Sequence, residues 1–276
     1  MPKVSIIIVH YRVPELLKLN LKSIENTLKG FDYETIVVDW GAIRKTADMI
    51  KEGFPNVRYL PFKENNGYAK GVNTGAENAR GEYLLFLNPD IILKENSVQK
   101  MVRYMEEHPD IGILGPKLLG FDGLIQHSYF RFYKPITVIL RRLSWLAKIF
   151  NLRRVIDNFL MLDTNPNKIQ TPDWLMGSVL MVSRQALNKV GKMDERFFMY
   201  FEDVDWCRRF WQNGYKVVYY PEAVMYHYHQ RESYSGWGPL DVFVNRTTRR
   251  HIKSGFKYFF KYRNINKPTL KLLHEK

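Results

Sequence analysis

Residues 81–90 read Gly-Glu-Tyr-Leu-Leu-Phe-Leu-Asn-Pro-Asp, and the chain on either side of them can be interpreted as scaffolding for the last carboxylate. The apolar run from Tyr83 to Leu87 has the length and composition of a strand buried on both faces. Proline cannot extend a strand's hydrogen-bond ladder, so Asp90 is expected just past the carboxyl end of this strand. Ligands bind at that edge in open α/β sheets. On composition alone, a plain turn is the favoured interpretation of Asn-Pro-Asp.

Strand-like and helix-like segments alternate around this stretch. Apolar runs of strand length are expected at residues 4–9, 35–38, 57–60, 83–87 and 111–114, and helices near 16–28, 45–51, 66–79 and 95–107. The alternation predicts an α/β fold with a mostly parallel central sheet and helices on both faces.

The pattern changes in residues 127–168, where aromatic and basic residues mix with apolar ones. An amphipathic helix is expected at 136–150. It is compatible with an interfacial membrane segment and equally with a helix pair that packs on the domain and leaves a basic face in water. A second basic, aromatic helix is expected within 242–262, so residues 236–276 are interpreted as a C-terminal helical segment that follows a domain of residues 1–235.

Order returns with a strand-like run at 174–182 and a helix that starts at Glu202 and ends before Gly214. Acidic residues in its first turn, arginines later and a terminal glycine all agree with the helix dipole and with glycine as a stop signal. Asp203 shares the apolar face of this helix, so it is either buried against a cation or exposed in a ligand cleft. Glu202 and Asp205 are explained as ordinary acids of a helix N-terminus. A strand at 216–220, closed by Pro221, is expected to follow.

Composition limits the classes of function. The chain of 276 residues has one cysteine, an apolar fraction of 45% and a net charge of +14. An internal disulfide framework is excluded, and a protein that is made and kept in the cytoplasm is expected. The positive charge favours an anionic partner, which is nucleic acid, anionic lipid or a phosphorylated substrate.

Six stretches in a fixed order give the sequence its resemblance to a known family. They are residues 4–11, 35–39, 66–75, 81–90, 174–182 and 197–214, and the last contains Phe-Phe-Met-Tyr-Phe-Glu-Asp-Val-Asp. The sequence resembles the inverting family 2 glycosyltransferases of GT-A fold, especially their rhamnosyltransferase-like branch. The resemblance covers most of residues 3–235 and implies a GT-A fold with a nucleotide-diphosphate sugar as donor.

The resemblance implies a divalent metal, Mg²⁺ or Mn²⁺, because a cation with oxygen ligands neutralises the leaving diphosphate. Asp90 stands at the family's metal-binding aspartate. Asn88 replaces the first acid of the DxD motif and is placed with the donor-binding residues. His227 is placed with Asp90 as a metal ligand, His229 being the alternative, and Arg231 is placed at the diphosphate.

Four more residues match the family's nucleotide site. Tyr11 and Asp39 stand where the family stacks on and hydrogen-bonds the base, although the sequence after Asp39 departs from the family's pattern. Asn66 and Lys70 lie in the family's glycine-rich helix start, and Lys70 is placed near phosphate. Without the resemblance, a packing tyrosine, a turn acid and a solvated lysine are the favoured interpretations of Tyr11, Asp39 and Lys70.

Asp203 matches the family's catalytic base, which takes the proton from the acceptor hydroxyl. Its place on the apolar face of the helix is expected to raise its pKa. Asp205 is the runner-up for this role.

The sequence thus predicts metal-assisted, inverting sugar transfer to a glycan or lipid-linked acceptor for the cell envelope. Basic, aromatic segments are expected to hold the enzyme at the anionic inner face of the plasma membrane. The alternatives are a sugar-phosphate nucleotidyltransferase and a non-enzymatic nucleic-acid or membrane-binding protein. The first is disfavoured because the sequence lacks a glycine-rich triphosphate-binding loop near residue 10. Nucleic acid is not expected as a partner, because no RNA-binding strand motif is present and the acidic residues would face it.

Overall fold

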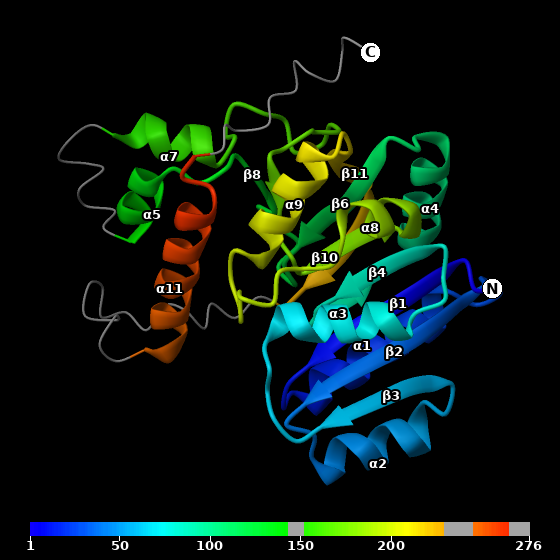
Figure 1. Cartoon of the computed structure of the whole chain (residues 1–276). Helices are drawn as coiled ribbons and strands as arrows, with labels where there is room; N and C mark the ends of the chain where they lie inside the picture. The colour runs from blue at the N-terminus through cyan, green and yellow to red at the C-terminus, as the bar shows by residue number, and fades with distance from the viewer. Residues whose placement is uncertain (143–151, 229–244, 265–276) are drawn as a thin grey trace.

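A computed structural model describes residues 1–142, 152–228 and 245–264 (Figure 1). The first half of the chain forms β1 (Val4–His10), α1 (Pro14–Thr27), β2 (Tyr33–Trp40), α2 (Arg44–Gly53), β3 (Val57–Phe62), α3 (Tyr68–Asn78), β4 (Tyr83–Leu87), β5 (Ile91–Leu93), α4 (Ser97–Glu107) and β6 (Ile111–Leu119). The second half forms β7 (Ile125–Gln126), β8 (Tyr129–Phe130), α5 (Pro135–Arg142), α7 (Arg153–Phe159), β9 (Trp174–Leu175), β10 (Val179–Ser183), α8 (Arg184–Val190), α9 (Glu202–Gln212), β11 (Lys216–His227) and α11 (Arg246–Lys261).

The central sheet has the strand order β3-β2-β1-β4-β10-β6-β11-β5, with β7 paired to β6. Strands β1, β2, β3 and β4 are parallel, as are β6 and β11, whereas β10 and β5 run antiparallel to their neighbours. The expected α/β architecture with a mostly parallel sheet is confirmed. β8 and β9 form a separate two-stranded sheet.

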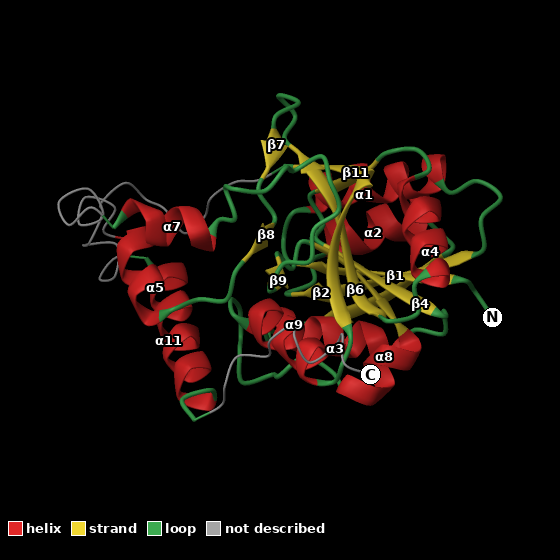
Figure 2. Cartoon of the chain, turned by 90° about the horizontal axis from the view of Figure 1, so that it is seen from above, coloured by secondary structure: helices red, strands yellow, loops and turns green. Residues whose placement is uncertain are grey.

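Two hydrophobic layers hold helices against the two faces of the sheet (Figure 2). Successive side chains of β1 point to opposite faces, so Ile6 and Ile8 pack with the layer under α1, α2 and α4, while Ile7 packs with the layer under α3, α8 and α9. All three isoleucines are fully buried. This double cover explains why the strands read as continuous apolar runs.

β11 corrects the prediction of a strand closed by Pro221. The strand continues to His227, and its register against β6 shifts between Tyr220 and Val224. A bulge accommodates the proline, whose missing N–H would break a regular ladder. The continuation carries His227 to the edge of the sheet where Ile91 pairs with it.

The helices α5, α7 and α11 lie together beyond α9, on the side away from β1–β3 (Figures 1 and 2). α5 begins as the sequence predicts, but residues 143–151 of the expected helix lie outside the described residues. The inner face of α11 is buried at Tyr258, which packs into the same core as α9. None of the helices in the described ranges is long and apolar enough to cross a membrane.

Candidate active site

The carboxyl ends of β1, β2 and β4 bring the predicted nucleotide-side residues to one edge of the sheet. The registers His10↔Asp39 and Ile8↔Leu87 place Tyr11, Asp39 and Asn88 next to one another along this edge. Tyr11 is 46% exposed, and its ring lies against Gly41, where a Cβ atom would stand 3.0 Å from the ring. An exposed ring held on a glycine offers a flat surface for stacking.

Asp39 is buried and already has two partners. Its Oδ1 lies 2.6 Å from His10 Nδ1, and its Oδ2 accepts a hydrogen bond of 2.6 Å from the Tyr59 hydroxyl. The backbone N–H of Val13 donates to His10 Nε2, so the proton of this imidazole lies on Nδ1 and points to Asp39. The side chain of Asp39 is only 1% exposed.

The start of α3 lies beside this edge. Gly67 has φ +95°, and a Cβ there would stand 2.4 Å from the carbonyl oxygen of Phe198, so only glycine fits. Helix α3 therefore begins at Tyr68, two residues later than the predicted start at Asn66. Asn66 and Lys70 are both exposed at this end of the helix.

Asp90 and His227 meet at the other side of β4. His227 Nε2 lies 3.4 Å from Asp90 Oδ2, and the side chains are 3% and 21% exposed. The backbone N–H of Tyr228 donates to the carbonyl oxygen of Asp90, and that of Asn88 donates to Ser178, which fixes the turn. Within the described ranges, no three His, Cys, Asp or Glu side chains come close enough together to hold a metal by themselves.

Gln126 fixes the tautomer of His227. Its side-chain Nε2 donates to the carbonyl oxygen of His227, which turns its Oε1 toward His227 Nδ1 at 2.9 Å. Nδ1 therefore carries a proton, and Nε2 is the ring nitrogen nearest to Asp90. Nε2 and Asp90 Oδ2, 3.4 Å apart, are a nitrogen and an oxygen of the kinds that ligate divalent cations. The sequence analysis predicted His227 but not its contact with Gln126, because nothing in the sequence identifies Gln126 as part of a site.

Asp203 begins α9 and is partly buried. Its Oδ2 accepts a hydrogen bond of 2.9 Å from the backbone N–H of Gly177, and its Oδ1 accepts one of 2.8 Å from that of Val204. A Cβ at residue 177 would stand 3.3 Å from the carboxylate, so glycine allows the close approach. Burial raises the pKa of Asp203 to about 6, against the lowering effect of these hydrogen bonds.

Tyr68 links α3 to this carboxylate. Its hydroxyl donates a hydrogen bond of 2.6 Å to the carbonyl oxygen of Gly177. Burial and the negative charges of Glu202, Asp203 and Asp90 raise the pKa of Tyr68 well above its usual value. The structure thus brings Asp90 and Asp203 within electrostatic reach of one neutral phenol, which the sequence analysis did not single out.

Glu202 and Asp205 are not ordinary solvated acids of a helix start. Glu202 is 5% exposed and its Oε2 has no hydrogen-bond partner among the described residues; burial and the charge of Asp203 raise its pKa well above the usual range. Asp205 is fully buried and bonds to Lys261 at 2.5 Å, Tyr262 at 2.8 Å and Arg209 at 3.0 Å. Asp205 is buried because α11 and the residue that follows it pack over it, which the helix pattern of α9 alone cannot reveal.

The N-terminus of α9 is held in an unusual conformation. Tyr200 and Phe201 have φ +70° and +68°, in the left-handed region that costs non-glycine residues energy. Phe201 is buried against α11, where a Cβ at Gly255 would stand 3.3 Å from its ring. Packing against α11 therefore stabilises the strained entry that aims Asp203. The predicted Arg231 and His229 lie outside the described residues.

Comparison with known proteins identifies relatives of this chain. The family model described as Glycosyl transferase family 2 matches residues 5–156, and the one described as Glycosyl transferase family group 2 matches residues 83–251. N-acetylglucosaminyl-diphospho-decaprenol L-rhamnosyltransferase of Mycobacterium tuberculosis is 28% identical over 70% of the chain, which spans 66% of that relative. Rhamnosyltransferase WbbL of Escherichia coli is 26% identical, with 95% of each protein covered.

Solved structures confirm the fold. GalNAc-T7, crystallised with UDP, GalNAc and Mn²⁺, superposes with a TM-score of 0.65 at 15% identity, over 96% of this chain and 50% of that one. The expected GT-A fold is therefore confirmed.

Proposed function

Because the chain belongs to glycosyl transferase family 2, we propose that it transfers a sugar, rhamnose being the first candidate, from a nucleotide-diphosphate donor with inversion. The rhamnosyltransferase names of two relatives support this donor sugar, and the UDP in the GalNAc-T7 structure supports the donor class. The acceptor is a glycan or a lipid-linked sugar, and the name of the mycobacterial relative supports a sugar carried on a lipid diphosphate.

The donor lies along the edge formed by β1, β2 and β4. Tyr11 stacks on the base, and Asn66, Lys70 and Asn88 line the path to the phosphates. Asp39 forms the floor beneath the base. Its carboxylate accepts from His10 and Tyr59 and, when ionised, has further lone pairs for a base N–H.

The donor set at Asp90 and His227 fits a divalent cation, Mg²⁺ or Mn²⁺. A carboxylate oxygen of Asp90 and Nε2 of His227 face each other there, and the contact of Gln126 with Nδ1 leaves Nε2 as the nitrogen for a metal. The bound cation supplies charge neutralisation for the leaving diphosphate. With only two protein ligands, its affinity depends on the diphosphate of the donor.

Asp203 acts as the general base. Its carboxylate takes the proton of the acceptor hydroxyl while that oxygen attacks the anomeric carbon, and the bond to the diphosphate breaks on the opposite face. A pKa of about 6 leaves the carboxylate ionised at neutral pH yet more basic than an exposed aspartate. The N–H groups of Gly177 and Val204 aim it without neutralising it.

The observation that carries the proposal is that the raised-pKa carboxylate of Asp203 and the carboxylate of Asp90 both act on the hydroxyl of Tyr68, whose pKa burial and these charges raise. A panel of thymidine, uridine and guanosine diphosphate sugars with Mn²⁺ or Mg²⁺ tests it by thermal shift, because a ligand that binds only the native state raises the melting temperature. We expect at least one donor to shift the melting temperature only when metal is present. No shift with any donor would contradict the proposal.

We further propose that α11 holds the enzyme at the anionic inner face of the plasma membrane. Phe256 and Phe260 lie one helical turn apart and are 74% and 68% exposed, and Arg249 and Lys253 are exposed on the same helix. Phe256→Ser with Phe260→Ser is expected to reduce sedimentation with phosphatidylglycerol vesicles while the melting temperature is unchanged. Unaltered sedimentation would remove α11 from this role.

A further inference from the structure

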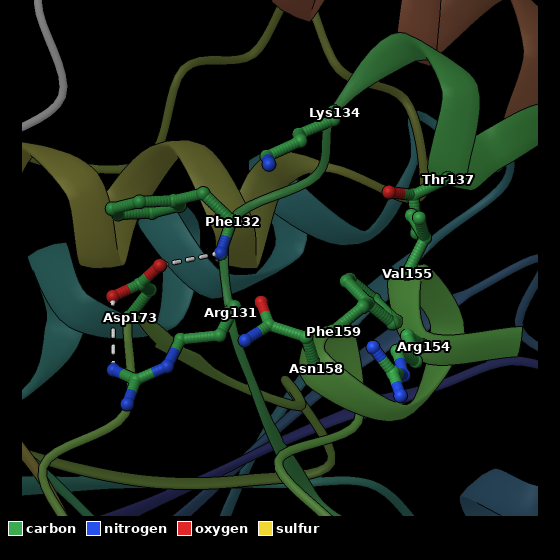
Figure 3. A pocket seen from close by; sticks show the side chains of 9 residues that line it. All are labelled: Arg131, Phe132, Lys134, Thr137, Arg154, Val155, Asn158, Phe159 and Asp173. Carbon is green, nitrogen blue, oxygen red and sulfur yellow. Dashed lines mark hydrogen bonds and ion pairs between the residues drawn. The ribbon is translucent and has the colours of Figure 1, made fainter. Parts of the chain in front are cut away.

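A cavity of about 470 Å³ lies in residues 127–173, apart from the donor edge (Figure 3). Three cations line it, Arg131 after β8, Lys134 before α5 and Arg154 in α7, and one carboxylate, Asp173. Arg131 lies 3.5 Å from Asp173, but Lys134 and Arg154 have no ion-pair partner within the described ranges. The cavity therefore has an excess of positive charge that the protein itself does not neutralise.

Hydrogen bonds hold the wall of the cavity in place. The backbone N–H of Phe132 donates to Asp173 Oδ2 at 2.6 Å, and the indole N–H of Trp174 donates to the carbonyl oxygen of Arg131 at 2.9 Å. The pairing of Phe130 with Trp174 joins β8 to β9 behind these contacts. Arg131 and Asp173 are thus held in place before any ligand arrives.

The cavity is connected to the base along α9. The indole N–H of Trp211 donates to the carbonyl oxygen of Asp173, and the N–H of Gly177 donates to Asp203. Residues 173–177 therefore run beside the helix from Trp211 back to Asp203, a helical distance of about 12 Å. The four-residue step from Asp173 to Gly177 cannot exceed about 14 Å.

The cavity lies away from the proposed donor edge. The donor edge belongs to β1, β2 and β4, whereas β8, α5 and α7 lie beyond α9 in both views (Figures 1 and 2). An acceptor whose hydroxyl reaches Asp203 would extend toward this cavity with the remainder of its length. A sugar with a diphosphate at its anomeric carbon carries its negative charge at the end away from the attacking hydroxyl, which is the end that would face the cavity.

We propose that the cavity lined by Arg131, Lys134 and Arg154 binds the diphosphate of the acceptor. Asp173 neutralises Arg131, so Lys134 and Arg154 supply the net positive charge of the cavity. Arg131, which Asp173 holds in position, supplies guanidinium N–H donors. The inference rests on the proposed function, since it assigns the acceptor subsite of the same reaction. It makes the diphosphate, more than the sugar, the group by which the enzyme selects its acceptor.

The test measures binding of inorganic pyrophosphate in EDTA, where the donor site has no metal. The pocket variant is Lys134→Gln with Arg154→Gln. The control is Lys18→Gln in α1 with Lys29→Gln just after α1, because these exposed lysines have no described partner either. We expect the pocket variant to bind pyrophosphate at least about tenfold more weakly, as the loss of charge-assisted hydrogen bonds predicts. The control and Asp90→Asn should bind it as the wild type does.

Two further arms separate the possible causes. Unchanged pyrophosphate affinity in the pocket variant overturns the inference. If that variant also binds phosphatidylglycerol vesicles more weakly than the wild type does, the cavity is a lipid headgroup site. Mn²⁺-dependent binding of nucleoside diphosphates should be equal in the wild type, the pocket variant and the lysine control, and weaker in Asp90→Asn, which lacks a proposed metal ligand. If every form fails to bind them while pyrophosphate binding still needs Lys134 and Arg154, the proposed function fails and the anion site stands.

Discussion

Asp203 and Asp205 lie two residues apart in the first turn of α9, yet they differ in exposure and in hydrogen-bond partners. Asp203 is partly exposed and accepts only backbone N–H groups, whereas Asp205 is fully buried and bonds to two cations and a phenol. A carboxylate without a cationic partner can still take a proton, and one neutralised by cations cannot do so readily. The comparison supports the proposal that Asp203 serves the reaction, whereas Asp205 joins α9 to α11.

The largest expected effect concerns the stability of Asp205→Asn. Removing the charge leaves Lys261 and Arg209 facing a neutral amide in a buried site, which typically costs about 3–5 kcal/mol of unfolding free energy. Urea denaturation measures it. Glu107→Gln, which breaks the exposed pair with Arg103, is the control and should cost less than about 0.5 kcal/mol. Equal losses in the two variants would remove Asp205 from its structural role.

A second prediction extends the comparison to the other open carboxylate, Asp90. Gln126→Ala removes the contact that fixes the tautomer of His227, and loss of such a supporting contact lowers metal affinity about 10- to 100-fold. Titration of Mn²⁺ in the presence of a saturating nucleoside diphosphate measures the change, with His108→Ala as a control histidine away from the site. An unchanged Mn²⁺ affinity would show that His227 is not a ligand of the metal.

The third prediction concerns pH. Because Asp203 must be ionised to act as a base, the transfer rate should fall about tenfold per pH unit below its pKa of about 6. Its effect on stability has the opposite sign. A folded pKa above the unfolded value favours the protonated form, so the contribution is fully present below the unfolded pKa and is lost as pH rises through about 6. A rate that stays constant down to about pH 4.5 would contradict the assignment of the base.

The smallest expected effect belongs to Glu202→Gln. Burial and the nearby charge of Asp203 favour the protonated form of Glu202, whose shape and charge glutamine reproduces. The acidic limb of the rate profile should therefore move by less than about 0.5 pH unit. A shift of more than about one unit would mean that Glu202 is ionised and controls the pKa of its neighbour.

Much of the fold follows from local pattern. The buried runs of β1, β2 and β4 are strands with both faces covered, and the acid-to-arginine gradient of α9 marks its start and end. The stop predicted at Pro221 was wrong because a bulge lets the strand continue, and only the neighbouring strand decides that. Short β5, which places Asp90 beside His227, has too few residues to form a pattern.

The site was predictable where a residue ends a strand and not where it acts through a distant partner. Asp90 and Asp39 stand at strand ends, and His10 was visible in the same way as a polar residue that closes an apolar run. Gln126 is 101 residues from His227 and Lys261 is 56 residues from Asp205, so neither contact leaves a local trace. The burial of Asp205 has the same origin, because it depends on how α11 packs.

The most direct test of the central claim is the rate of sugar transfer by Asp203→Asn, measured together with its affinity for a nucleoside diphosphate and Mn²⁺. Asparagine keeps the shape of the side chain and cannot accept the proton. We expect the rate to fall about a thousandfold while the affinity and the melting temperature do not decrease. A variant that retains most of its transfer activity would contradict the account.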